Sequence, residues 1–310
     1  MRKGPFGRTG LEVSEVGFGA APVGVLEVEA PRTREVLTAL LDAGVNLVDT
    51  AACYRESESL LGETVSHRRE EFVLVTKCGH RVEGTSGAEW SRELVLESVE
   101  RSLRRLRTDH LDVVLLHSCD RATLERGEAL AALVEAREAG KVRFCGYSGD
   151  DDAARYAAGL PEVAVLEVSV NICDQSNLDS ALPAARERGL GVLAKRPIAN
   201  AAWRKPSEQP GLYADYASTY HERLKRMGVT ARDLGFEGPP VSAWPELALR
   251  FTLSQPGVHC AIVGTTDPAN AAANLAAAAK GPLSDESVER LREAFHAAER
   301  ASGARWTGQT

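Results

Sequence analysis

Eight short apolar segments divide the chain, and they constrain its fold more than any other feature of the sequence. They cover residues 16–19, 45–49, 72–77, 111–118, 142–148, 163–169, 190–196 and 258–264. These segments are apolar throughout instead of strictly alternating, which is typical of parallel strands that helices cover on one face. Longer segments with helical character separate them. The sequence therefore predicts an α/β fold in which strands and helices alternate.

The segment after the third apolar run has clear helical periodicity. In residues 92–107, RELVLESVERSLRRLR, apolar side chains recur at spacings of three and four, at Val95, Val99, Leu103 and Leu106. Ser91 precedes them as a predicted N-cap. Eight strand-helix units fit a (β/α)8 TIM barrel better than an open doubly wound sheet. The stretch GFGAAP also lacks the third glycine of a dinucleotide-binding G-x-G-x-x-G loop, because Pro22 stands near that place.

Three further segments are expected to modify the simple repeat. Residues 4–16, with a Gly-rich turn, predict an N-terminal β-hairpin that closes the bottom of the barrel. Residues 199–243 predict a long functional loop after the seventh strand, expected to form one wall of a substrate pocket. This loop contains Trp203, Tyr213, Tyr216 and Tyr220. Residues 284–302 predict an extra C-terminal amphipathic helix. Since there is no internal repeat or linker, we expect residues 1–310 to form a single domain.

Composition and charge favour a small-molecule partner. The formal net charge is −7 and the predicted pI about 5.6, so no global positive field would attract nucleic acid or an anionic membrane. The first residues contain no apolar signal region, and no run reaches the roughly 18 apolar residues of a spanning helix. We expect a cytoplasmic protein that is a monomer or small homo-oligomer. The six cysteines form no C-x-x-C pair, so we expect reduced, mostly buried thiols and no metal site.

Four ionisable side chains stand where three neighbouring apolar runs end. Asp49 ends the second run and Tyr54 follows it, Lys77 ends the third, and His117 lies near the end of the fourth. Each one alone has an ordinary structural explanation, such as a helix cap, a rim aromatic, a strand-end charge or a core histidine. In a (β/α)8 barrel, however, active sites form where strands end and the following loops begin. Four such residues at matching positions therefore indicate a site.

The four side chains are suited to proton transfer at a carbonyl. A free phenol has a pKa of about 10, and a nearby ammonium such as that of Lys77 should lower the pKa of Tyr54. Asp49 would hold the lysine, and His117 would donate a hydrogen bond to a carbonyl oxygen. Such a set could protonate an alkoxide as it forms. The set contains no group that attacks the carbonyl carbon, so we expect a nicotinamide cofactor to supply a hydride to that carbon.

These motifs resemble those of the aldo-keto reductase superfamily. The family signature D-T-A-x-x-Y-x-x-S-E-x-x-L-G is matched at Asp49, Thr50, Ala51, Tyr54, Ser57, Glu58, Leu61 and Gly62. The stretches GRTGLEVSEVGFGA, VTKCG and LDVVLLHS stand in the family's order, and the resemblance covers nearly the whole chain. It implies a (β/α)8 barrel that binds NADPH in an extended form at its C-terminal face. It also implies Tyr54 as general acid/base, Lys77 and Asp49 as residues that tune it, and His117 as the residue that positions substrate.

The same resemblance implies a set of cofactor contacts. They fall at Gly19, Ala20, Ser148, Glu167, Lys195, Pro197, Ile198, Gly264, Thr265, Asn270 and Asn274. Three positions depart from the family's pattern: Gly149 replaces an asparagine, Glu167 a glutamine, and Lys195 an aromatic that often stacks on the nicotinamide. Basic side chains that many relatives direct at the 2′-phosphate are replaced by Gly264 and Asn270. Because the resemblance implies a family that usually binds NADP(H), we expect NADP(H) as the cofactor, with NAD(H) as the alternative.

The leading hypothesis is an NAD(P)H-dependent oxidoreductase that acts on the carbonyl or alcohol of a small aldehyde, ketone or sugar. A Schiff-base lyase using Lys77 is a second possibility, since a desolvated strand-end lysine can attack a carbonyl. A slow sensor that binds cofactor is a third, motivated by the three departures. Arg55, Lys195 and Arg196 further indicate a pocket more basic than the net charge implies, and so an anionic substrate.

Overall fold

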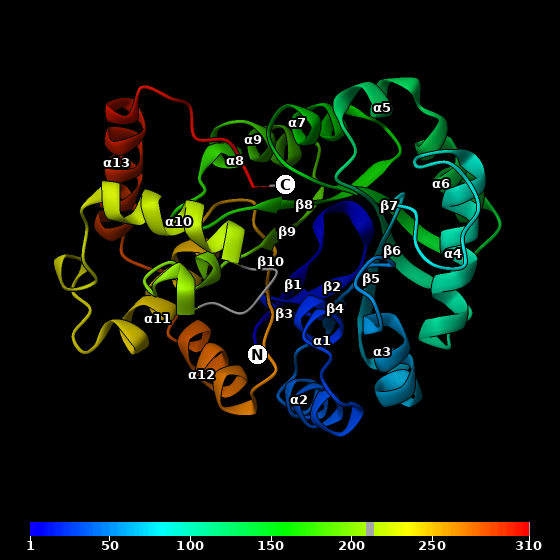
Figure 1. Cartoon of the computed structure of the whole chain (residues 1–310), viewed down its shortest axis with the longest axis horizontal. Coiled ribbons are helices and arrows are strands. Elements are labelled where there is room, and N and C mark those ends of the chain that lie inside the picture. Colours follow the sequence, from blue (N-terminus) through cyan, green and yellow to red (C-terminus); the bar gives the residue numbers. More distant parts are fainter. Residues whose placement is uncertain (209–213, 310) are drawn as a thin grey trace.

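The computed structural model describes residues 1–208 and 214–309. A closed barrel of eight parallel strands lies at the centre, with helices around it (Figure 1). The strands are β3 (Val16–Gly19), β4 (Leu47–Asp49), β5 (Val73–Cys78), β6 (Leu111–His117), β7 (Val142–Ser148), β8 (Val163–Ser169), β9 (Gly191–Lys195) and β10 (Cys260–Val263). Pairing of β10 with β3 closes the barrel. The predicted (β/α)8 barrel is confirmed, and one strand falls at each apolar run, with β5 ending one residue beyond its run.

Helices follow the strands and cover the barrel from outside. They are α1 (Ala21–Val25), α2 (Ala30–Asp42), α3 (Ser57–Val65), α4 (Arg92–Leu106), α5 (Arg121–Arg126), α6 (Glu128–Glu138), α7 (Asp151–Gly159), α8 (Ser176–Asp179), α9 (Ala181–Glu187), α11 (Pro240–Leu253) and α12 (Pro268–Ala279). The predicted cap of α4 is present, because Ser91 Oγ accepts a hydrogen bond from the Leu94 amide at 3.2 Å. Val95 and Val99 are buried against the barrel, as their spacing predicts. Among the described residues, no helix has both the length and the apolar character needed to cross a membrane.

The N-terminal hairpin closes one end of the barrel. Strands β1 (Lys3–Pro5) and β2 (Glu12–Ser14) pair antiparallel, as predicted. Between them, Phe6 is fully buried in the apolar cluster inside the barrel, together with Val75 and Val165. Gly7 has a φ of +55°, and a Cβ there would lie 2.3 Å from the Gly191 amide nitrogen. Only glycine allows this close approach of the hairpin to β9.

Residues 199–243 contain more regular structure than the expected loop. Helix α10 (Ala214–Met227) and the start of α11 lie within them. Tyr220 and Met227 of α10 are buried in a second apolar cluster with Phe295 of α13 (Asp285–Ser302), the predicted C-terminal helix. The two tryptophans Trp203 and Trp244 stack at 6.3 Å between ring centres. The segment therefore has a core of its own, separate from the barrel's. Tyr213 and the side chain of Tyr216 lie outside the described residues.

After α13 the chain returns to the barrel. Figure 1 shows this red tail ending beside β8 and β9. The Gly308 amide donates a hydrogen bond to Asp151 at 2.7 Å, and the Gln309 amide donates one to Asp174 at 3.1 Å. Because these acids follow β7 and β8, the tail lies over the carboxyl ends of the strands.

Candidate active site

The period of two along each strand brings one layer of polar side chains together inside the barrel. The apolar interior includes Leu47, Val75, Leu115, Val165 and Leu193, one from each of five strands. Alternate strand residues face the same side, so the residue two positions later also points inward, nearer the carboxyl end. Those residues are Asp49, Lys77, His117, Glu167 and Lys195. Asp49, Lys77 and His117, three of the four predicted catalytic residues, therefore share a layer with two of the predicted cofactor contacts, whereas Tyr54 lies on the loop after β4.

Lys77 lies at the centre of this layer and is fully buried. Its Nζ is 2.6 Å from Asp49 Oδ1 and 3.3 Å from Glu167 Oε2, and it donates a hydrogen bond to the Thr50 carbonyl at 2.9 Å. Burial alone would lower the pKa of Lys77, but the two carboxylates raise it further, so the side chain is an ammonium. The contact with Glu167 was not predicted from the sequence.

The two carboxyl groups beside Lys77, those of Asp49 and Glu167, are both buried. Burial, and after it the Glu167 carboxylate, raise the pKa of Asp49 well above its ordinary value although Lys77 lowers it. Ser148 Oγ donates a hydrogen bond to Glu167 Oε1 at 3.2 Å. Asp49 and Glu167 are 3% and 2% exposed, so both carboxyl groups lie away from water.

Tyr54 lies near both the lysine and the histidine. Its ring centre is 5.2 Å from Lys77 Nζ and 5.7 Å from the His117 ring, which it meets edge-on. We expected Lys77 to lower the pKa of Tyr54. It does, but burial raises that pKa more, so the net shift is upward and Tyr54 is a phenol. The correction follows from desolvation, which sequence spacing does not show.

His117 is a neutral imidazole. Burial and the charge of Lys77 lower its pKa well below the ordinary value. Cys53 Sγ lies 3.3 Å from His117 Nδ1. The ring of His80 is 5.4 Å from that of His117, and Trp90 is 4.9 Å from His80. The sequence reasoning missed His80 and Trp90, although both lie in the segment between β5 and α4 that follows Lys77.

Four residues of the signature, Thr50, Ser57, Glu58 and Gly62, hold the loop that carries Tyr54. Ser57 Oγ lies 2.9 Å from Thr50 Oγ1 and donates to a backbone carbonyl after β3. Glu58 is fully buried and accepts hydrogen bonds from hydroxyl groups of β5 and α4. A Cβ at Gly62 would lie 2.1 Å from the Arg105 carbonyl oxygen, so only glycine lets α3 pack this closely on α4. The motif therefore fixes Tyr54 by anchoring α3.

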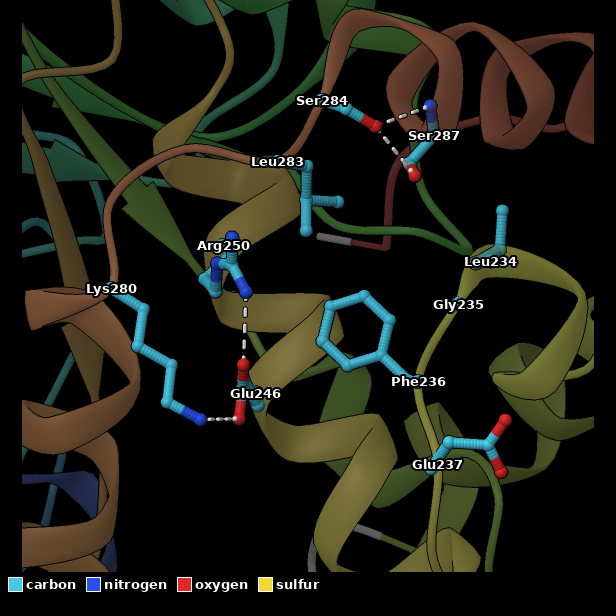
Figure 2. A pocket seen from close by; sticks show the side chains of 10 residues that line it. All are labelled: Leu234, Gly235, Phe236, Glu237, Glu246, Arg250, Lys280, Leu283, Ser284 and Ser287. Atoms are coloured by element: carbon cyan, nitrogen blue, oxygen red, sulfur yellow. Dashed lines mark hydrogen bonds and ion pairs between the residues drawn. The ribbon is translucent and has the colours of Figure 1, made fainter.

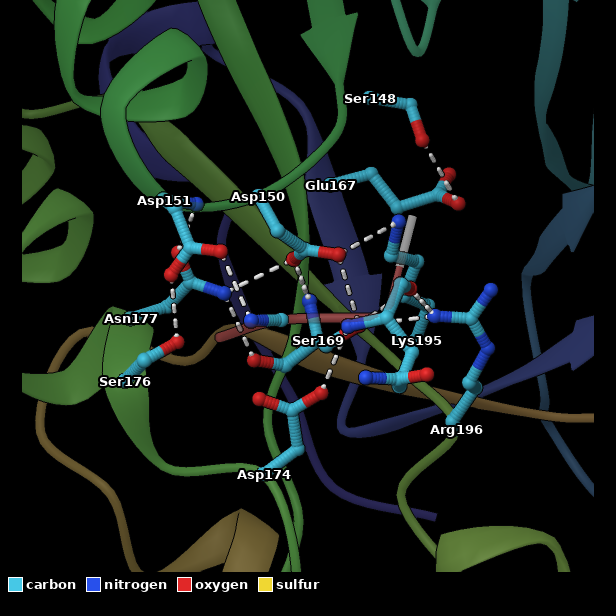
Figure 3. Close-up of polar contacts among 12 residues, drawn as sticks. Ser148, Asp150, Asp151, Glu167, Ser169, Asp174, Ser176, Asn177, Lys195 and Arg196 are labelled. Atoms are coloured by element: carbon cyan, nitrogen blue, oxygen red, sulfur yellow. Dashed lines mark hydrogen bonds and ion pairs between the residues drawn. The ribbon is translucent and has the colours of Figure 1, made fainter. Parts of the chain in front are cut away.

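A polar network lies at the ends of β7, β8 and β9 (Figure 3). Asp150 Oδ2 is 3.1 Å from Lys195 Nζ, and Asp150 Oδ1 accepts hydrogen bonds from the Ser169 amide and from Asn177. Burial would raise the pKa of Asp150, but Lys195 and Arg196 lower it overall, so it is a carboxylate. The sequence did not point to Asp150 because it follows β7 in a loop.

The cations that suggested a basic pocket have acidic or polar partners. Lys195 pairs with Asp150, and Arg196 donates to Ser169 Oγ at 2.9 Å and to the Gln309 carbonyl. Arg55 pairs with Glu27 at 2.9 Å, and both side chains are largely exposed. The structure therefore does not support the expected excess of positive charge.

The predicted cofactor residues adjoin the strands of Asp49 and His117 on both sides, since Gly19 pairs with Asp49 and Ser148 pairs with His117. They fall on or after β7, β8, β9, β10 and β3, which are neighbours in the closed sheet, whereas Asp49, Lys77 and His117 lie on β4 to β6. Individual positions include Ser148, Glu167, Lys195, Pro197, Ile198, Gly264, Thr265, Gly19 and Ala20. Asn270 and Asn274 belong to α12, where the first is exposed and the second buried. Together these residues follow a continuous arc around the rim.

Two glycines on this arc have steric explanations. A Cβ at Gly264 would lie 2.8 Å from Pro22 Cγ and 3.1 Å from the Gly19 carbonyl oxygen. A Cβ at Gly149 would lie 2.2 Å from Tyr147 Oη, which donates a hydrogen bond to the Cys119 carbonyl at 2.7 Å. An asparagine at position 149 therefore cannot fit beside this buried tyrosine. Tyr147 accounts for the departure at Gly149.

Two surface pockets differ in their relation to the site. One, of about 620 Å³, is lined by Cys53, Ala52 and Arg55 and so adjoins the loop that carries Tyr54. The other, of about 420 Å³, is drawn in Figure 2. There Glu246 is paired with Arg250 at 2.9 Å and with Lys280 at 2.6 Å. The first pocket is the better candidate for substrate, because Cys53, one of its lining residues, lies 3.3 Å from His117 Nδ1, whereas the second pocket is lined by residues between Leu234 and Ser287.

Comparison with known proteins agrees with this geometry. The model of the Aldo/keto reductase family matches residues 15–295. L-Galactose dehydrogenase of Arabidopsis thaliana is 29% identical over 87% of this chain and 86% of its own length. The NADH-specific methylglyoxal reductase of Escherichia coli (strain K12) is 27% identical over 97% and 100%, respectively. The solved holo form of aldo-keto reductase AKR11C1 from Bacillus halodurans is 26% identical, covers 95% of this chain and 96% of its own, and superposes with a TM-score of 0.79. The chain therefore belongs to the aldo/keto reductase family of oxidoreductases, whose members generally bind nicotinamide cofactors.

Proposed function

We propose that the protein transfers hydride between a nicotinamide cofactor and the carbonyl or alcohol carbon of a small aldehyde, ketone or sugar. Tyr54 acts as the general acid/base. The observation that carries this proposal is the position of the Tyr54 ring, 5.2 Å from the Lys77 ammonium and 5.7 Å from the His117 ring. The adjoining pocket of about 620 Å³ has a volume ordinary for small-molecule sites.

Each side chain has a distinct task in carbonyl reduction. His117, as a neutral imidazole, donates its N–H to the carbonyl oxygen and orients it. Tyr54 holds its proton in the resting site and gives it to that oxygen as negative charge develops there. The phenolate that remains is stabilised by the Lys77 ammonium, which Asp49 holds at 2.6 Å. A bound nicotinamide supplies the hydride. In alcohol oxidation the same residues act in reverse.

The residues present fit a nicotinamide cofactor. Glu167 Oε2 is a buried oxygen without a hydrogen-bond partner among the described residues, and it suits the N–H group of a carboxamide. Ser148 lies beside it. At the far end of the arc, Arg32 of α2 donates to the Thr266 carbonyl at 3.0 Å and lies 3.6 Å from Asp267. This guanidinium also pairs with Glu35 at 2.9 Å, so the proposal of NADP(H) rests on the family resemblance, with NAD(H) as the alternative.

Replacing Tyr54 by phenylalanine tests the proposal. Methylglyoxal and a panel of aldehydes and sugars serve as substrates, and NADPH and NADH are titrated separately by fluorescence. We expect Tyr54→Phe to lower the rate of reduction by about 10²–10⁴-fold, because the proton donor is lost, while the cofactor affinities stay unchanged. Equal rates in the two proteins would refute the role of Tyr54. Cofactor binding without turnover in the wild type would instead favour the sensor hypothesis.

The structure argues against the Schiff-base lyase. A lysine attacks a carbonyl only as the neutral amine. Lys77 is buried between two carboxylates that raise its pKa, and it donates a hydrogen bond to the Thr50 carbonyl. Its nitrogen is thus charged and already bonded.

A further inference from the structure

The imidazole of His117 has a sulfur neighbour at one of its two nitrogens. Cys53 Sγ lies 3.3 Å from His117 Nδ1, within hydrogen-bond distance for sulfur. The sulfur comes from the loop after β4, one residue before Tyr54, and the imidazole comes from the end of β6. Within the described part of the chain, this is the one hydrogen-bond contact of the His117 ring. Cys53 is therefore the neighbour that can fix which nitrogen carries the hydrogen.

The aromatic neighbours of His117 hold the plane of its ring. The Tyr54 ring meets the imidazole at 82° with 5.7 Å between ring centres, and the His80 ring meets it at 68° with 5.4 Å. Such edge-on packing restricts rotation of the ring. It does not decide the tautomer, although a neutral imidazole has only one N–H donor. The position of that hydrogen is set by the hydrogen bond that the other nitrogen makes.

The contact between Cys53 and His117 joins two neutral groups. Burial raises the pKa of the Cys53 thiol, and burial together with the charge of Lys77 lowers the pKa of His117. A pair of thiolate and imidazolium, as in cysteine nucleophiles, is therefore disfavoured. A single hydrogen then lies between sulfur and nitrogen. Sulfur is a weak acceptor, whereas the unprotonated ring nitrogen is a good one, so this hydrogen belongs to the thiol.

We propose that Cys53 is a positioning residue that fixes His117 as the tautomer with its hydrogen on Nε2. The S–H group donates to Nδ1, which leaves Nε2–H to donate to the carbonyl oxygen of the substrate. This assignment rests on the proposed function and extends it. The opposite tautomer would place a lone pair of Nε2 against that oxygen. Position 53 is one of the two open positions in D-T-A-x-x-Y, so the thiol is a feature of this chain and not of the signature.

Nitrogen NMR of the ligand-free protein with isotopically labelled histidine tests the tautomer directly. A ring nitrogen that carries a hydrogen resonates far from one that does not, and couplings to the ring C–H protons distinguish Nδ1 from Nε2. The signals that are missing from His117→Gln identify His117. We expect the hydrogen on Nε2 in the wild type and in Cys53→Ser. In Cys53→Ala the Nδ1 resonance should shift, because this acceptor has lost its donor.

Turnover gives a second measurement. Cys53→Ala should lower kcat/KM for carbonyl reduction by about 2- to 10-fold, the effect of one hydrogen bond, while cofactor affinity stays the same. Cys53→Ser should recover most of this loss, because a hydroxyl group also donates. Cys145 offers a matched control, since it is buried on β7 and its Sγ donates to the Leu133 carbonyl at 3.5 Å. Cys145→Ala should leave the His117 resonances and kcat/KM unchanged.

Three results would overturn the proposal. They are a hydrogen on Nδ1 in the wild type, an Nδ1 resonance that is the same in Cys53→Ala and wild type, and a Cys53→Ser variant no more active than Cys53→Ala. The spectra are recorded without substrate or cofactor, so they are independent of the proposed function. Full activity in Tyr54→Phe would refute the role of Tyr54 and leave the tautomer measurement valid.

Discussion

Replacing Lys77 by methionine should destabilise the protein, and more strongly at alkaline than at acidic pH. The two side chains have similar lengths, so the main change is the loss of a charge. In the wild type this charge lies 2.6 Å from Asp49 and 3.3 Å from Glu167, and the lysine side chain is 0% exposed. Methionine leaves both carboxyl groups buried without the ammonium that they share.

The size of the effect follows from this burial. Removing one partner of a buried ion pair typically costs about 3–5 kcal/mol. For a chain of 310 residues, with an unfolding entropy of about 2.1 cal/mol/K per residue, this corresponds to a fall in Tm of about 5–8 °C. An exposed pair of the same length serves as control: Arg92 and Glu135 are 2.6 Å apart but 59% and 47% exposed. Arg92→Met should change stability by about 1 kcal/mol or less.

The pH dependence has a definite sign. Lys77 lowers the pKa of Asp49, so its loss moves the folded-state pKa still further above the unfolded value of about 4. A carboxyl group with a raised folded-state pKa destabilises the fold once the pH exceeds the unfolded value, and increasingly so up to the folded value. Calorimetric scans of both variants at about pH 5 and pH 8 measure this difference. A loss in Lys77→Met that is equal at both pH values, or no larger than that in Arg92→Met, would refute the reasoning.

Two other predictions follow from close contacts near the site. Gly62→Ala should destabilise the protein by about 1–3 kcal/mol in urea unfolding, because its Cβ would lie 2.1 Å from a backbone carbonyl that cannot move aside. Gly159→Ala, where a Cβ meets nothing within 4 Å, is the control, and equal losses would contradict the packing argument. Iodoacetamide should label Cys53 before the other five cysteines, which are buried. The rate of carbonyl reduction should fall in proportion to the labelling of Cys53, because the added group blocks the contact between Cys53 and His117. Burial raises the pKa of the Cys53 thiol, so labelling should need a more alkaline pH than a free cysteine does. The Cys53→Ser variant should keep its activity in iodoacetamide. Inactivation of that variant at the wild-type rate would exclude Cys53 as the site of inactivation.

Much of the barrel could be predicted because its signals are local. Each strand is an apolar run, and the Ser91 cap is set by the backbone just after it. The ends of the runs also indicated Asp49, Lys77 and His117, since carboxyl ends of parallel strands meet at one rim. Helix α10 was missed although its buried residues Ala217, Tyr220, Leu224 and Met227 recur at spacings of three and four, because the segment was interpreted from its length and its mixture of aromatic, proline and charged residues.

The sequence by itself determined the order of the strands, the inward positions along each strand and the residue types that end them. Only the tertiary structure decided which of these side chains meet and how they are charged. Closure of the barrel brings Glu167 of β8 to Lys77 of β5. Burial then raises the pKa of Tyr54 against the effect of Lys77. Such contacts join strands far apart in the chain, and desolvation depends on everything packed around a group, so neither follows from local spacing.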